Sequence, residues 1–134
     1  MNQHLTNSNF EPNLLHENSL GYISQCEECK EITVGIKSIM FFCSVKILKD
    51  LKKMIASICS RMDEHVFIVN GEQKVVLCTI HENVKLSFTI SEMLELNELL
   101  EQSLHMIEIN NLFNPGNISC SEPVSIGIFF CNFK

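Results

Sequence analysis

Three short stretches near the start of the chain have the composition and pattern of β-strands. In residues 32–37, ITVGIK, every second side chain is apolar, which is the period of a strand with one buried face. The run LGYISQ at 20–25 is also predicted to be a strand, and the run SIMFFC at 38–43 is predicted to be the return arm of a hairpin. The pattern therefore predicts three strands between residues 20 and 43.

The spacing of apolar residues changes to three and four after Ser44. The residues with this spacing are Leu48, Leu51, Ile55, Ile58 and Met62. Such a period places apolar side chains on one face of a helix, and Ser44 suits the N-cap position. A set of lysines falls mostly on the other face, where we expect solvent. These are Lys46, Lys49, Lys52 and Lys53.

The second half of the chain has a similar order of strands and helix. Asn70-Gly71 lies between two β-rich runs and predicts a hairpin, because both turn positions need a positive φ. Alternating apolar residues at 84, 86 and 88 predict a further strand. Thr89 and Glu92 form a capping-box sequence, which predicts a second helix that ends near Asn110. The exposed side of this helix is expected to carry Glu92, Glu95, Glu98 and Glu101.

Two short cysteine motifs occupy matching places in these halves. Cys26-x-x-Cys29 and Cys78-x-x-His81 are offset by 52 residues, and apolar residues follow each motif at the third, fifth and seventh positions. We therefore expect an α+β fold of two degenerate β-β-α halves, with one antiparallel sheet, two helices on one face and zinc-knuckle-like turns. The alternative is chance, since alternating apolar residues occur in any sheet.

The two ends of the chain differ from this middle part. Residues 1–19 are rich in asparagine and lack periodicity, so they are predicted to be a flexible arm. Residues 20–112 are expected to form a single α+β domain. Residues 113–134 are expected to be a tail, in which Asn-Pro-Gly at 114–116 interrupts regular structure and residues 125–131 can form one added strand.

Composition limits the partners and the compartment. The 134 residues include 16 acidic and 10 basic residues, for a formal net charge of -6, and an acidic chain repels the phosphate backbone of nucleic acids. The start of the chain lacks the pattern of a signal peptide, and no apolar run reaches the roughly 18 residues that span a bilayer. We therefore expect a cytoplasmic protein that binds neither nucleic acid nor membranes.

The two cysteine motifs together suggest one zinc site. Structural zinc takes four cysteine or histidine ligands at tetrahedral corners, and a Cys-x-x-Cys turn supplies two of them. Cys26, Cys29, Cys78 and His81 complete a Cys3His site if the two halves pair about a pseudo-twofold axis. The odd number of cysteines, seven, favours thiols and metal thiolates over a disulfide framework. The leading hypothesis is a zinc-binding interaction or regulatory module with a structural metal.

Two other functions stay open. Cys26 and Cys29 can serve as a redox dithiol or a metal sensor, although a strand follows the motif where a redox dithiol needs a helix N-terminus, and Glu27 and Glu28 raise the thiol pKa. The chain can also be a metal-free interaction protein, with buried cysteines and a homodimer formed through a sheet edge or the acidic helix. An enzyme is not expected, because the sequence lacks a glycine-rich phosphate loop, Gly-x-Ser-x-Gly and the motifs of zinc hydrolases.

The run GYISQCEECKEITVGI at residues 21–36, followed by a helix, resembles a family of small uncharacterised proteins from Bacteroidota. The resemblance covers roughly residues 16–110, and the Cys-x-x-Cys run is its distinctive part. It implies no activity, cofactor or partner. It supports the domain boundary, and the tail from residue 114 lies outside it.

Overall fold

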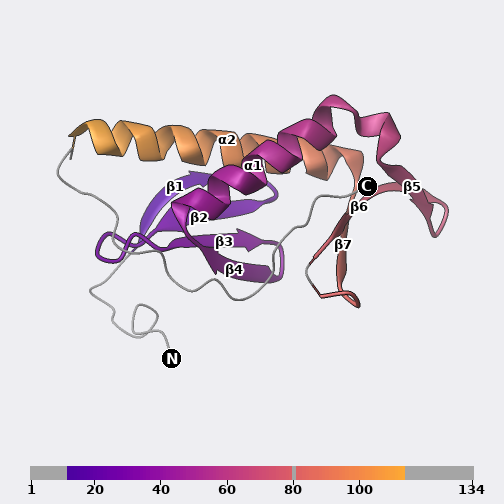
Figure 1. The fold of residues 1–134 in the computed structure, drawn as a ribbon, viewed down its shortest axis with the longest axis horizontal. Coiled ribbons are helices and arrows are strands. Elements are labelled where there is room, and N and C mark those ends of the chain that lie inside the picture. Colours follow the sequence, from indigo (N-terminus) through magenta and orange to yellow (C-terminus); the bar gives the residue numbers. More distant parts are fainter. Residues whose placement is uncertain (1–11, 80, 114–134) are drawn as a thin grey trace.

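The computed structural model describes residues 12–79 and 81–113. In these ranges the chain forms two antiparallel sheets and two long helices that pack against them (Figure 1). The predicted α+β class is therefore confirmed. The predictions for residues 1–11 and for the tail from residue 114, including the strand at 125–131, lie outside the described residues.

The first sheet contains four strands in the order β1-β2-β3-β4. Their bounds are β1 Asn13–Glu17, β2 Gly21–Gln25, β3 Ile32–Ile36 and β4 Ile39–Cys43. The last three confirm the strands predicted between residues 20 and 43, whereas β1 lies inside the segment predicted to be a flexible arm. This part of the prediction is wrong because β1 is stabilised by pairing with β2 and by packing on a distant helix, and local periodicity encodes neither contact.

The second sheet contains three strands in the order β5-β6-β7, and it is separate from the first. Its strands are β5 Val66–Val69, β6 Glu72–Cys78 and β7 Lys85–Phe88. The prediction of a single sheet is wrong, because the 16-residue helix α1 (Val45–Ser60) and a short 3-10 turn (Met62–Glu64) lead the chain away from β4 before β5 begins. The two halves thus have four strands and three strands, and the internal repeat stays a prediction.

Both helices begin at the predicted caps. The Ile47 N–H donates to Ser44 Oγ at 3.2 Å at the start of α1. At the start of α2 (Ile90–Phe113), the Glu92 N–H donates to Thr89 Oγ1 at 3.0 Å and the Thr89 N–H donates to Glu92 Oε1 at 2.9 Å, which is a complete capping box. The helix continues beyond the predicted end near Asn110.

One apolar core joins these elements. Ile23, Val34 and Phe41 are cross-strand neighbours on the buried face of the first sheet, and they share a cluster with buried residues of both helices. Helix α2 packs on β1 and β2 of the first sheet and on β6 and β7 of the second (Figure 1). In the described ranges, no helix combines the length and the apolar composition needed to cross a lipid bilayer.

Candidate metal site

The turn that carries Cys26 and Cys29, here called the first turn (residues 26–29), connects β2 to β3. The Cys26 N–H donates to the Glu31 carbonyl oxygen, and the Lys30 N–H donates to the Cys26 carbonyl oxygen, both at 2.9 Å. The Cys29 N–H points at Cys26 Sγ, at 3.4 Å. Cys26 is buried and Cys29 is exposed, and the two thiols lie within hydrogen-bonding distance of each other.

Lys30 closes the first turn with a left-handed backbone. Its φ is +65°, and this conformation reverses the chain directly after Cys29 so that β3 can pair with β2. The Gln25 side chain supports the reversal by donating from Nε2 to the Lys30 carbonyl oxygen at 3.3 Å. A positive φ costs a lysine more than a glycine, and for this reason the conformation was not predictable from the residue type.

The protonation of the Cys29 thiol is set by partial burial and by its neighbours. Burial raises the pKa of the Cys29 thiol above its usual value, a hydrogen bond with the Glu31 backbone lowers it, and the nearby Cys26 raises it again. Burial also raises the pKa of Cys43, on β4, to about 12, so this cysteine behaves as a core residue. A divalent cation at the first turn would supply the positive charge that favours the Cys29 thiolate.

The turn that carries Cys78 and His81, here called the second turn (residues 78–81), connects β6 to β7 and depends partly on one side chain. Thr79 Oγ1 accepts from the His81 N–H at 3.1 Å and lies 2.7 Å from the Val84 carbonyl oxygen, to which it donates. Cys78 is half-buried and His81 is exposed. The Val84 N–H also donates to the His81 carbonyl oxygen at 3.0 Å. The hydroxyl of Thr79 and this backbone hydrogen bond therefore organise the second turn together, whereas backbone hydrogen bonds close the first turn.

The structure does not bring the two turns together. The first turn lies at one end of the β2–β3 pair, and Lys37 lies just beyond the other end, where its Nζ is 3.1 Å from Glu92 Oε2 at the start of α2. The second sheet adjoins this start of α2, whereas the first turn lies towards the opposite end of the helix (Figure 1). Among the described residues, no three His, Cys, Asp or Glu side chains are grouped so that they could hold a metal ion. The four predicted ligands thus form two separate pairs.

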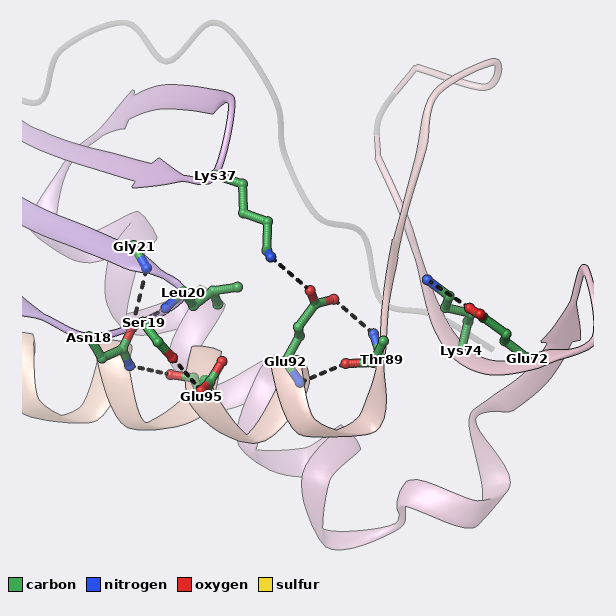
Figure 2. Close-up of polar contacts among 10 residues, drawn as sticks. All are labelled: Asn18, Ser19, Leu20, Gly21, Lys37, Glu72, Lys74, Thr89, Glu92 and Glu95. Carbon is green, nitrogen blue, oxygen red and sulfur yellow. Dashed lines mark hydrogen bonds and ion pairs between the residues drawn. The ribbon is translucent and has the colours of Figure 1, made fainter.

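Sequence reasoning missed a row of polar contacts along α2 (Figure 2). The turn between β1 and β2 contributes Asn18, whose Nδ2 donates to the Glu95 carbonyl oxygen at 3.0 Å and to Glu98 Oε1 at 2.7 Å. Its Oδ1 accepts from the backbone N–H groups of Leu20 and Gly21. Ser19 donates to the Glu95 carboxylate. One asparagine therefore shapes the turn and attaches it to the helix.

These contacts give partners to three of the glutamates on α2. The predicted exposure is confirmed for Glu98 and Glu101, whereas Glu92 and Glu95 are half-buried. Glu92, Glu95 and Glu98 contact the first sheet or its turns, through Lys37, through Asn18 and Ser19, and through His16, whose Nε2 lies 3.0 Å from Glu98 Oε2. Their spacing of three residues shows in the sequence that they share a helix face, but the partners of that face are distant in sequence.

The comparison with known protein families matches residues 9–119 to a family of unknown function, DUF6686. The chain belongs to this family. The match extends beyond the predicted range of the resemblance at both ends, and it agrees with the expectation of an uncharacterised family. No curated protein and no solved structure matches the chain. Since the description of DUF6686 states no activity, a function has to be argued from the geometry.

Proposed function

We propose that this DUF6686 protein is a small zinc-binding module in which the metal is structural and which acts through interaction or regulation. The observation that carries the proposal is the geometry of the first turn. Cys26 and Cys29 are three residues apart in a turn closed by backbone hydrogen bonds, and one amide already points at Cys26 Sγ. Amides directed at sulfur offset the negative charge of zinc thiolates.

The first turn supplies two adjacent corners of a zinc tetrahedron, and two more ligands are needed. The sequence proposes Cys78 and His81 for these corners. Because the second turn belongs to the other sheet, this pair completes the site only if the second sheet moves towards the first turn or if the pair comes from another copy of the chain. Zinc binding is therefore proposed first for Cys26 and Cys29. Whether Cys78 and His81 are the other two ligands is a second question.

Metal content per chain tests both questions. We expect about one zinc per chain in protein purified without a histidine tag, lost in Cys29→Ser together with a fall in melting temperature. Glu82→Ala is the matched control for His81→Ala, because it truncates an exposed side chain next to His81. Zinc lost in His81→Ala and kept in Glu82→Ala would support the full Cys3His set. Zinc kept in His81→Ala would exclude His81 as a ligand, and a wild type without metal would refute the proposal.

A redox dithiol is the alternative for the same two cysteines. The raised pKa of Cys29 opposes it, because the thiolate is the nucleophile in thiol–disulfide exchange. We expect alkylation of Cys29 by iodoacetamide to be slow at pH 7 and to accelerate as the pH rises. Fast alkylation at pH 7, with a reversible Cys26–Cys29 disulfide detected by mass spectrometry, would favour the redox function over zinc.

A further inference from the structure

An open groove with a volume of about 710 Å³ lies between α1 and α2. The two helices run in opposite directions, since Cys59 Sγ near the end of α1 lies 3.6 Å from the Met93 carbonyl oxygen near the start of α2. The groove opens at the other ends of the helices, where Val45 and Asn111 both line it. It is distant from the start of α2, which adjoins the second sheet.

The walls of this groove carry opposite charges. Lys49, Lys52 and Lys53 line it from α1, whereas Glu101 and Glu108 line it from α2. In the described ranges, none of these five side chains forms an ion pair. Apolar side chains also line the groove, namely those of Val45, Leu104 and Ile107. The groove thus has a positive strip on α1, a negative strip on α2 and apolar side chains from both helices.

A surface with this order of charges is complementary to itself. A two-fold axis parallel to the groove turns a second copy so that its negative strip faces the positive strip of the first, and its positive strip faces the negative strip. A homodimer interface of this kind is isologous, because each copy contributes the same patch. A nucleic acid or a uniformly acidic peptide would meet the lysines but would be repelled by the glutamates.

We propose that this groove is the interface of a homodimer, with the α1 lysines of each copy facing the α2 glutamates of the other. The exposed apolar side chains at the end of α2 extend the patch. Leu112 and Phe113 are each 79% exposed, and Leu112 follows Glu108 by four residues, so both lie on the same helix face. A second copy that covers them adds the apolar area that a stable interface needs.

Charge reversal tests the interface, with sedimentation velocity on the full chain as the readout. Lys49→Glu with Lys53→Glu makes both strips negative, and Glu101→Lys with Glu108→Lys makes both strips positive. We expect each double variant to dimerise at least ~10-fold more weakly than the wild type. An equimolar mixture of the two variants restores opposite charges at both contacts, so we expect it to form a heterodimer.

A matched control separates the groove from net charge. Lys46→Glu with Lys85→Glu causes the same change in charge at exposed lysines outside the groove, and we expect it to dimerise like the wild type. Circular dichroism verifies that each variant is folded. A wild type that is monomeric up to ~100 µM, well above typical dimer affinities, would overturn the proposal and leave the groove to another occupant. A dimer insensitive to both groove variants, or a mixture that stays monomeric, would also overturn it.

Discussion

The two sheets differ in how completely their strands are buried. In the first sheet, Ile23 and Val34 are fully buried on the helix side, and Ser24 and Gly35 are also buried on the opposite side. The ring of Tyr22 lies over Gly35 there. In the second sheet burial is one-sided, and β5 leaves Ile68 69% exposed. The first sheet therefore contributes more apolar burial per strand than the second.

The sheets also differ in their contacts with α2. Polar side chains of the first sheet and its turns contact Glu92 and Glu95 (Figure 2), and they also contact Glu98 further along the helix. The second sheet adjoins only the start of the same helix. Regions with fewer buried apolar contacts open at lower free energy. The first turn thus belongs to the more stable sheet and the second turn to the less stable one.

The largest difference between the sheets is expected from two glycine substitutions. A Cβ at Gly21 in β2 would overlap the carbonyl oxygen of Gly35, which cannot move without disturbing the β2–β3 pairing. Gly71, in the β5–β6 turn, has a φ of +80° and nothing within 4 Å of the added Cβ. We expect Gly21→Ala to lower the free energy of unfolding by about 4 kcal/mol and Gly71→Ala by about 1 kcal/mol. Urea unfolding measures both losses in free energy of unfolding, and equal losses would contradict the inferred difference between the two sheets.

Two isoleucines give the next largest contrast. Ile23 is fully buried in β2 and Ile68 is 69% exposed in β5. Truncation of Ile23 leaves a cavity among packed neighbours, so we expect Ile23→Ala to lower the free energy of unfolding by about 3 kcal/mol. Ile68→Ala removes contacts mostly with water, and we expect a change within about 0.5 kcal/mol. Thermal unfolding of the two variants provides the measurement. A cost at Ile68 close to that at Ile23 would mean that β5 is covered in solution, for instance by another chain.

The local elements were predictable because their signals are local. Alternation predicted β3, and β4 was predicted as the return arm of its hairpin. Ser44 marked the start of α1, and Asn70-Gly71 marked the β5–β6 turn, where both residues have positive φ. β1 was missed because Asn18 attaches it to Glu98, which is 80 residues away in the sequence. The separation into two sheets was missed for a similar reason, since alternation identifies strands but not their partners.

For the candidate site too, only the local part was predictable from the sequence. The sequence indicates that Cys26 and Cys29 share a turn, and the structure adds the amide that points at Cys26 Sγ. Convergence of this turn with Cys78 and His81 depends on where two sheets lie in space, which residue spacing does not determine. The groove between α1 and α2 was also out of reach, because a helical pattern assigns lysines and glutamates to faces but does not indicate which faces meet.

The third contrast concerns the two turns themselves. Thr79→Val keeps the shape of the side chain but removes the hydroxyl that forms hydrogen bonds within the second turn. We therefore expect it to lower the free energy of unfolding by about 1.5 kcal/mol. Hydrogen exchange should become faster at residues 81–84 and stay unchanged at residues 26–31, because the first turn is closed by its own backbone. Thr33→Val on β3 is the control, with little expected effect on either turn. Faster exchange in both turns would show that they are coupled.

The smallest effect is expected at Glu92, where the two regions meet. Its pKa is lowered by the hydrogen bond from the Thr89 backbone and by Lys37 and Lys74. Because the folded-state pKa lies below the usual 4.5, this carboxylate stabilises the fold above that value, and the contribution is lost as the pH falls through the folded-state pKa. We expect Glu92→Gln to lower the free energy of unfolding by about 1 kcal/mol at pH 7. This difference from the wild type should disappear as the pH falls. Glu82→Gln, at an exposed site outside both helices, is the matched control for the loss of one carboxylate. If the difference in free energy of unfolding between Glu92→Gln and the wild type stays constant with pH, the charge of Glu92 does not stabilise the junction between the sheets.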